Sequence, residues 1–259
     1  MNGAEPEGAM VAVRDLTKRF SAGRRDGVLA VDSVSFEVAA GASLGVVGES
    51  GSGKSTLARC LLHLIEPTSG EAIIDGVALR GLAPRHLRRQ RRQLQLVPQD
   101  SHAALDPRMS VRQIVEEPLV VHGERNASVR LAAVEEMLDL VGLEDSLVAR
   151  RPAALSGGQR QRVSIARSLI LKPRLVVLDE PVSALDVCVQ AQIVNLLKSL
   201  QRTLGTTYVV ILHDLALARY LCDDVAVMHR GRIVEHRPAA SIIEDACHPY
   251  TRSLIDAIP

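Results

Sequence analysis

Aromatic side chains and cysteines are scarce in this chain. Its 259 residues include two Phe, three Tyr, no Trp and four Cys. The cysteines form no C-x-x-C pair, because they are scattered at Cys60, Cys188, Cys222 and Cys247. We therefore expect reduced, structurally incidental thiols, and neither a disulfide framework nor a metal cage.

A surplus of charge of one sign is also lacking. The 31 basic and 30 acidic residues leave a net charge of +1. This balance gives no general reason to expect nucleic acid or a strongly anionic membrane surface as a partner. The basic run at residues 85–92 is interpreted as a solvated helix face, because no aromatic residues interleave with it.

Long hydrophobic runs are missing as well. The strongest, such as residues 208–212, are far too short to cross a bilayer. Residues 1–8 are acidic and rich in helix breakers, and they lack the basic and apolar regions of a secretory signal. We expect a cytoplasmic protein that does any work at a membrane through partners.

The apolar residues that are present follow the periods of strands in two regions. Val34, Phe36 and Val38 alternate with polar residues, which predicts a half-buried strand of an N-terminal β-layer. Residues 175–178 and 207–212 are continuous apolar runs, as expected of strands that are covered on both faces.

The middle of the chain has a different character. Residues 111–121 and 129–141 have helical spacing, and no buried strand is evident between them. The sequence therefore predicts an α/β fold in which a parallel core is interrupted by a helical lobe.

A glycine-rich segment with the spacing Gly-x-x-x-x-Gly-Lys-Ser follows the apolar residues 43–47. Backbone N–H groups of such a loop and of the next helix N-terminus can point at phosphate oxygens. Lys54 would reach the β- and γ-phosphates, and the Ser55 hydroxyl would ligate Mg²⁺. The residues predicted to bind the nucleotide are Gly48, Glu49, Ser50, Gly51, Ser52, Gly53, Lys54, Ser55 and Thr56.

Two carboxylates close the apolar run 175–178. In an α/β sheet, ligands collect at the carboxyl ends of the strands, where Asp179 and Glu180 would emerge. Alone, such a pair before Pro181 is more often a solvated turn. With the phosphate loop upstream, we expect Asp179 to help hold Mg²⁺ through water and Glu180 to polarise the attacking water as general base.

The segment Leu155-Ser156-Gly157-Gly158-Gln159 looks like a second helix start. Ser156 could cap the helix, and the two glycines leave backbone N–H groups open to an anion. By itself, an ordinary capped helix explains these residues. With LSGGQ between the phosphate loop and the Asp-Glu pair, the chain resembles the ATP-binding subunits of ABC transporters. The resemblance runs from about Val11 to the C-terminus.

The resemblance implies an overall organisation. The fold would be a P-loop (RecA-like) parallel-sheet core with an N-terminal antiparallel β-layer and an inserted helical lobe. The ATP-binding domain would span residues 11–235, with the lobe at about 100–158, and a tail would follow at 236–259. In this family two chains pack head to tail, so that each ATP lies between one phosphate loop and the other chain's LSGGQ. The segment along that interface would be Ser183, Ala184, Leu185 and Asp186.

The resemblance also implies roles for isolated residues. Gln99 would contact Mg²⁺ and the attacking water, although alone it would be taken for a loop residue. His213 would contact the γ-phosphate, although a histidine at a strand end is usually a satisfied polar residue. Phe20 is either an adenine-stacking ring or a core residue of the β-layer. The Mg²⁺ that accompanies ATP would be held by Ser55, Gln99 and Asp179.

Three further segments resemble ATPases of the dipeptide, oligopeptide and nickel importer group: residues 105–111 (LDPRMSV), 187–192 (VCVQAQ) and 248–254 (HPYTRSL). This implies two permease subunits, a second ATPase subunit (a paralogue or the same chain) and an extracytoplasmic solute-binding protein. The chain would lie peripherally on the cytoplasmic face of the membrane. Many such ATPases continue into a cysteine-containing extension, whereas this chain stops at Pro259, so no iron–sulfur cluster is expected.

Three alternatives stay open on the sequence alone. An exporter ATPase is disfavoured by the HPYT tail and the lack of a fused membrane span. A soluble ABC ATPase that remodels ribosomes or nucleic-acid complexes usually has two cassettes, coiled-coil insertions or zinc-ligand cysteines, so we expect no nucleic-acid partner. A regulatory module without turnover is opposed by the intact Glu180 and His213. The solute, peptide or nickel, is not determined.

Overall fold

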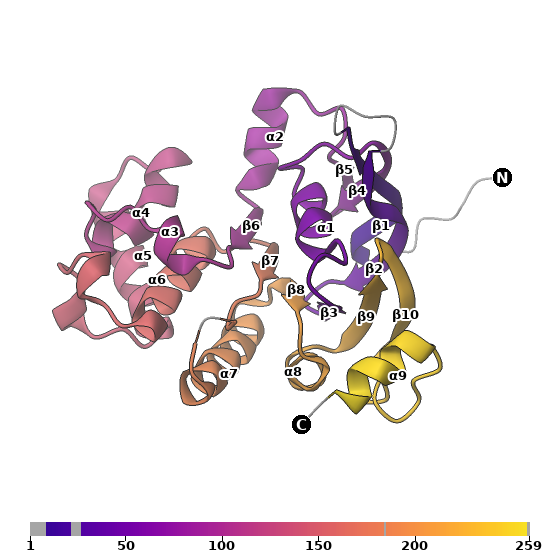
Figure 1. Ribbon diagram of the computed structural model, residues 1–259. Coiled ribbons are helices and arrows are strands. Elements are labelled where there is room, and N and C mark those ends of the chain that lie inside the picture. Colours follow the sequence, from indigo (N-terminus) through magenta and orange to yellow (C-terminus); the bar gives the residue numbers. More distant parts are fainter. Residues whose placement is uncertain (1–8, 22–26, 184, 258–259) are drawn as a thin grey trace. The chain divides into compact units, whose positions relative to one another are not determined.

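The computed structural model describes residues 9–21, 27–183 and 185–257, which fall into two compact units (Figure 1). The first unit combines the chain up to residue 88 with the chain from residue 207 onward, and the second comprises residues 89–206. The chain therefore leaves the first unit, builds the second, and returns.

A four-stranded antiparallel sheet forms the N-terminal part of the first unit. Its strand order is β2-β1-β4-β5, with bounds β1 Ala9–Phe20, β2 Val28–Ala39, β4 Ser69–Ile74 and β5 Val77–Ala78. Val34, Phe36 and Val38 are buried along β2 while their neighbours are exposed, as the alternation predicts. Asp75 and Gly76 both have positive φ and form the two-residue turn between β4 and β5.

The other strands of the first unit run in the order β10-β9-β3-β8, namely Arg232–Pro238, Asp224–His229, Ser43–Val47 and Thr207–Leu212. Central β3 is parallel to both β8 and β9, and β10 is antiparallel to β9. β3 and β8 are buried along their whole length, as expected of continuous apolar runs.

Helices flank these strands: α1 (Lys54–Leu61), α8 (Leu215–Leu221) and α9 (Pro249–Asp256). Figure 1 shows α9, in yellow, beside β10. The apolar spacing up to Ile65 predicts a longer α1, but the helix ends at Leu61. His63, just beyond, adopts a φ of 49°, which is incompatible with a continued right-handed helix.

The second unit pairs two parallel strands with helices. β6 (Leu94–Val97) pairs with β7 (Leu175–Asp179). The helices are α3 (Ser101–Ala104), α4 (Val111–Val121), α5 (Ala127–Leu140), α6 (Gly157–Leu169) and α7 (Val187–Leu204), with 3₁₀ turns η1 (Asp145–Leu147) and η2 (Pro152–Ala154).

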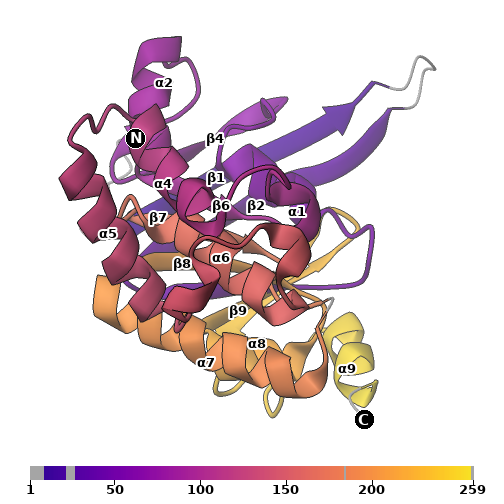
Figure 2. The ribbon, with the colours of Figure 1, turned by 90° about the vertical axis from the view of Figure 1, so that its left-hand side faces the viewer.

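Helices α4 and α5 of the predicted helical lobe pack against each other and against α6, which extends beyond the predicted end of the lobe at about residue 158 (Figure 2). α5 begins earlier than the apolar spacing suggests, because the Asn126 side chain accepts hydrogen bonds from the first N–H groups of that helix. The basic helix α2 (Pro84–Arg91), whose residues fall in both units, has no buried residue, in agreement with a solvated face. Within the described ranges, no helix has both the length and the apolar character of a membrane span.

Candidate nucleotide-binding and catalytic site

The glycines at the two ends of the phosphate loop are required by the packing of the first unit. The loop connects β3 to α1. A Cβ on Gly48 would lie 2.1 Å from the Met228 carbonyl oxygen, and a Cβ on Gly53 would lie 2.1 Å from the Ala30 carbonyl oxygen. Gly53 also has a φ of 108°, which side-chain-bearing residues rarely adopt. Any larger residue at either position would therefore displace the loop.

Lys54 is held inside this loop. The side chain is 4% exposed, and its Nζ donates hydrogen bonds to the carbonyl oxygens of Gly48 at 2.7 Å and Glu49 at 2.8 Å. Nδ1 of His213, which follows β8, lies 3.2 Å from the same Gly48 oxygen and 3.5 Å from Lys54 Nζ. The fold thus brings together the lysine and the histidine that the sequence singled out, 159 positions apart.

The start of α1 suits an anion. The N-cap residue is Gly53, and no side-chain cap hydrogen bond is made at this helix start among the described residues. Ser55 and Thr56 follow in the first turn and are half-buried. Phosphate oxygens are natural acceptors for N–H groups at such a helix start, and the nearby ammonium group of Lys54 adds positive charge.

The two carboxylates end β7 in the second unit. Asp179 is 5% exposed and Glu180 is 8% exposed. Glu180 Oε2 accepts a hydrogen bond from Gln99 Nε2 at 2.6 Å. Glu180 also has a φ of 49°, a sparsely populated conformation for a residue with a side chain. Backbone strain of this kind is found preferentially at functional sites.

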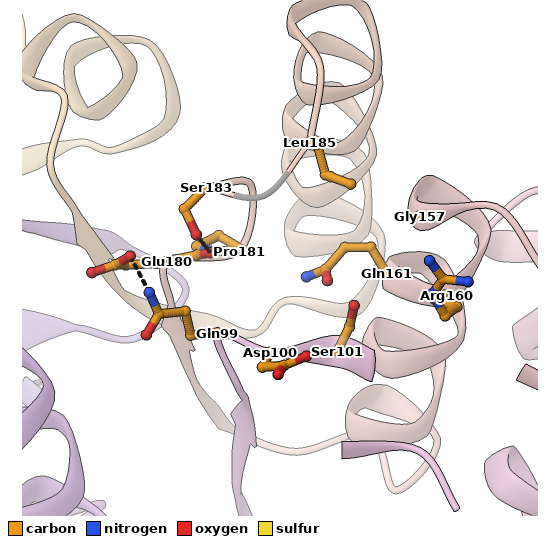
Figure 3. A pocket seen from close by; sticks show the side chains of 10 residues that line it. All are labelled: Gln99, Asp100, Ser101, Gly157, Arg160, Gln161, Glu180, Pro181, Ser183 and Leu185. Carbon is orange, nitrogen blue, oxygen red and sulfur yellow. Dashed lines mark hydrogen bonds between the residues drawn. The ribbon is translucent and has the colours of Figure 1, made fainter. Parts of the chain in front are cut away.

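A cavity of about 490 Å³ in the second unit collects residues from four predicted features (Figure 3). Glu180 and Gln99 line it together with Gly157 of LSGGQ and with Ser183 and Leu185 of the interface segment. The complete lining is Gln99, Asp100, Ser101, Gly157, Arg160, Gln161, Glu180, Pro181, Ser183 and Leu185.

The LSGGQ segment forms a capped helix start. The Ser156 hydroxyl accepts from the Gln159 N–H at 3.2 Å, and the Gln159 side chain accepts from the Ser156 N–H at 2.9 Å, a capping box. Leu155 is buried below it. A Cβ on Gly158 would lie 2.7 Å from Val189, whereas a Cβ on Gly157 would make only an ordinary contact, 3.4 Å from Leu185.

The interface segment begins three residues after Glu180. The Ser183 hydroxyl donates to the Glu180 carbonyl oxygen at 3.3 Å. Asp186 caps α7 by accepting from the Val189 N–H at 3.0 Å. Ala184, which belongs to the same prediction, lies outside the described residues.

The ring of Phe20 does not lie in the core of the β-layer. Phe20 ends β1 and is 39% exposed, and Lys18 Nζ lies 5.1 Å from the ring centroid. An exposed ring at the end of a strand is compatible with stacking on a base, and that role stays a prediction.

Sequence reasoning missed the polar residues that complete the cavity. Arg160 and Gln161 follow LSGGQ and appear in the sequence only as part of a helix. Gln161 is 3% exposed, and its Nε2 has no hydrogen-bond partner among the described residues. No local pattern could have indicated this, because the cavity is formed by segments that are distant in sequence.

The residues predicted to hold Mg²⁺ have suitable chemistry. Asp179 contributes a carboxylate, Gln99 an amide oxygen and Ser55 a hydroxyl, and oxygen donors of these types are the ones that Mg²⁺ takes. No cluster of three or more His, Cys, Asp or Glu that could hold a metal occurs in the described part of the chain. Such oxygen donors are compatible with a Mg²⁺ that is bound together with substrate phosphates.

Comparison with known proteins gives consistent matches. Residues 31–183 match the family model described as "ABC transporter". A putative peptide import ATP-binding protein of Brucella ovis is 46% identical over 98% of this chain and 80% of its own length. The putative oligopeptide transport ATP-binding protein YkfD of Bacillus subtilis is 44% identical over 96% of this chain and 76% of its own length. OppF of Streptococcus mutans, an oligopeptide transport ATP-binding protein, is 43% identical over 96% and 82%.

Solved structures confirm the predicted fold class. The ATP-binding cassette MJ0796, in a dimeric post-hydrolysis state bound to ADP and Pi, has a TM-score of 0.80 and 31% identity and covers 89% of this chain and 99% of its own. The structure of cbiO1 from Clostridium perfringens, part of the ABC transporter complex cbiONQ, has a TM-score of 0.82 and 27% identity and covers 92% of each chain.

Proposed function

This chain belongs to the ABC transporter family, as its motifs predict, and on that premise we propose that it is the ATP-hydrolysing subunit of a peptide importer. The observation that carries the proposal is the hydrogen bond from Gln99 to Glu180 in the cavity of the second unit (Figure 3). It brings a candidate general base and a polar residue that orients it to one place.

Glu180 is the proposed general base. The hydrogen bond from Gln99 fixes the position of one carboxylate oxygen, and a carboxylate can accept a proton from water. Burial of the carboxylate strengthens its interaction with the water it polarises. A positioned base of this kind contributes about 10²–10⁴-fold to a rate.

The phosphate loop is the proposed substrate site. Lys54 would turn from the Gly48 and Glu49 carbonyls toward the β- and γ-phosphates of ATP, while the N–H groups of the first turn of α1 hold their oxygens. His213 lies beside Lys54 and would contact the γ-phosphate. Ser55, Gln99 and Asp179 would hold the Mg²⁺ that accompanies ATP, and the ion would supply positive charge at the phosphates.

The LSGGQ helix is proposed to act on ATP held by a second subunit. Gly157 adopts an ordinary conformation and has room for a methyl group within its own chain, so the fold does not explain why glycine stands there. A nucleotide or partner approaching from outside would explain it. The dimeric state of the cassette MJ0796 supports this arrangement. ATP would stabilise the closed dimer, and hydrolysis would release it.

The importer assignment has its support in the relatives, whose names refer to peptide or oligopeptide transport. Peptides are therefore the preferred solute, and the nickel alternative has no such support from these relatives. We propose two permeases, a second ATPase subunit and a solute-binding protein as partners, with this chain peripheral on the cytoplasmic face of the membrane.

Hydrolysis is tested with Glu180→Gln in the purified chain. We expect the ATPase rate to fall at least about 100-fold while nucleotide binding persists, because only the base is lost. Glu144→Gln, a carboxylate on the helical lobe outside the cavity, is the matched control and should keep full activity. Unchanged turnover in Glu180→Gln would refute the assignment of the base.

The assembly is tested by capture from native membranes. Tagged Glu180→Gln chain is incubated with ATP and Mg²⁺, and the co-purified proteins are identified by mass spectrometry. Two multi-span permeases, with or without a second ATPase, support the transporter, and uptake of labelled di- and oligopeptides against nickel then identifies the solute. Recovery of ribosomal or nucleic-acid-binding proteins instead would favour the soluble ABC ATPase alternative.

A further inference from the structure

A hydrogen bond links the C-terminal helix to the phosphate loop. The hydroxyl oxygen of Tyr250, in the first turn of α9, accepts from the Glu49 N–H at 3.0 Å. Glu49 is the second residue of the loop, and 201 positions separate it from Tyr250. Both residues belong to the first unit. The C-terminal tail therefore contacts the backbone that would surround the phosphates.

The group that Tyr250 contacts is the peptide between Gly48 and Glu49, and both ends of that peptide are held. Its N–H donates to the Tyr250 hydroxyl. Its carbonyl oxygen, that of Gly48, accepts from Lys54 Nζ at 2.7 Å and lies 3.2 Å from His213 Nδ1, within hydrogen-bond distance when that nitrogen carries the proton. Because a peptide group is planar, fixing its N–H also fixes the direction of its carbonyl. The tyrosine thereby influences where Lys54 and His213 rest.

Tyr250 is itself firmly placed. Its ring lies 3.9 Å from the ring of His229 between centroids, tilted by 36°. Its N–H donates to Nδ1 of the N-cap residue His248 at 3.2 Å. Burial raises the pKa of the Tyr250 hydroxyl, which keeps the group neutral near neutral pH. A neutral phenol is a suitable acceptor for a backbone N–H.

The helix that carries Tyr250 is anchored on the β9–β10 hairpin. Glu235 of β10 accepts from the N–H groups of Cys247 and His248 at 2.9 and 3.1 Å. The same hairpin contacts the loop directly, because the Gly231 N–H donates to the Ser52 carbonyl oxygen at 2.9 Å. The hairpin and the tail thus support the loop through two separate hydrogen bonds, one at Ser52 and one at Glu49.

We propose that Tyr250 is a positioning residue of the nucleotide site, which orients the Gly48–Glu49 peptide so that Lys54 and His213 are held ready for the phosphates of a nucleoside di- or triphosphate. The inference rests on the proposed function of the phosphate loop. It assigns the HPYT segment a role in nucleotide affinity, in addition to its value as a mark of the importer group.

The test compares Tyr250→Phe with Tyr220→Phe in the full chain, with MgADP titrated by calorimetry and the KM and kcat for ATP measured separately. Each substitution removes one hydroxyl and keeps the ring, and Tyr220 is an exposed residue of α8. We expect Tyr250→Phe to bind MgADP about three- to tenfold more weakly and to raise KM similarly, as for loss of one hydrogen bond. The kcat and the melting temperature without nucleotide should stay near wild type, and Tyr220→Phe should match wild type throughout.

Lys54→Ala separates this inference from the proposed function. If Lys54→Ala abolishes MgADP binding while Tyr250→Phe binds like wild type, the positioning role is wrong and the nucleotide site stands. If Lys54→Ala binds MgADP as well as wild type, both proposals are overturned. A lower melting temperature of Tyr250→Phe at unchanged KM would assign the hydroxyl a structural role only and would also overturn the inference.

Discussion

The chain contains two glycine-containing helix starts, and they are built in different ways. α1 begins after the phosphate loop without a side-chain cap among the described residues, and Lys54 lies buried against the loop carbonyls. α6 begins at LSGGQ with a complete capping box between Ser156 and Gln159. The first start has glycine and no side-chain cap at its N-cap position, whereas the second satisfies part of its own N-terminus with side chains.

Gly53 and Gly157 also differ in whether their own chain leaves room for a side chain. Gly53 has a positive φ and would clash with the Ala30 carbonyl if it carried a side chain, so its own chain demands glycine. Gly157 has neither constraint. The chain itself therefore explains the glycine at the phosphate loop, whereas the glycine at LSGGQ is explained by the second subunit that we propose.

The largest effect is expected from Gly53→Ala. The new Cβ meets a backbone carbonyl at a φ of 108°, so we expect the free energy of unfolding to fall by about 2–4 kcal/mol and nucleotide binding to be lost. Urea unfolding followed by circular dichroism measures the first, and calorimetry with MgADP the second. Gly51→Ala is the control: its φ is +80° but it faces open space, so it should cost only about 1–2 kcal/mol. Equal stability of Gly53→Ala and wild type would contradict the packing argument.

Gly157→Ala is expected to reduce activity without reducing stability. We expect the free energy of unfolding to stay within about 0.5 kcal/mol of wild type, because the methyl group fits beside Leu185. The ATPase rate should nevertheless fall by about tenfold or more, equivalent to about 1.4 kcal/mol, because the methyl group obstructs the partner subunit's nucleotide. Size-exclusion chromatography of Glu180→Gln with ATP should also show loss of the dimer. Full activity of Gly157→Ala would remove the main argument for action between subunits.

The capping boxes at the starts of α4 and α6 allow the helix-capping role of Ser156 to be separated from a role in hydrolysis. Ser110 with Gln113 starts α4 in the same way that Ser156 with Gln159 starts α6. Each Ser→Ala substitution should lower the free energy of unfolding by about 1 kcal/mol. Only Ser156→Ala should also reduce ATPase activity, several-fold, in a steady-state assay. If both variants lose activity in proportion to their stability, Ser156 serves only as a helix cap.

The smallest effect concerns the tail that supports the phosphate loop. Burial alone would raise the pKa of Glu235, but hydrogen bonds from the Cys247 N–H, Arg237 and the His248 N–H outweigh it and lower this pKa to about 2. The ionised carboxylate therefore stabilises the fold above about pH 4.5, and this contribution is lost as the pH falls toward 2.

Glu235→Gln should accordingly be less stable than wild type at pH 7, by about 1 kcal/mol, because glutamine keeps one acceptor oxygen. The difference should shrink as the pH falls from about 4.5 to 2. Urea unfolding at a series of pH values measures it. A difference that is constant with pH would show that the carboxylate charge does not hold the tail.

The sequence by itself determined the parts that depend on neighbours along the chain. The phosphate loop needs closely spaced glycines between a strand and a helix, and the buried strands β3, β8 and most of β7 follow from continuous apolar runs. Family membership also came from short segments, because LSGGQ and the Asp179-Glu180 pair are each local.

Only the tertiary structure decided contacts between distant segments. Gln99 and Glu180 are hydrogen-bonded across 81 positions, and Tyr250 reaches Glu49 across 201. Gln161 Nε2, which has no hydrogen-bond partner in the described part of the chain, and the exposed ring of Phe20 likewise depend on which elements pack around them. The physical reason is that periodicity reports which face of an element is buried, but not which residue of another element it meets.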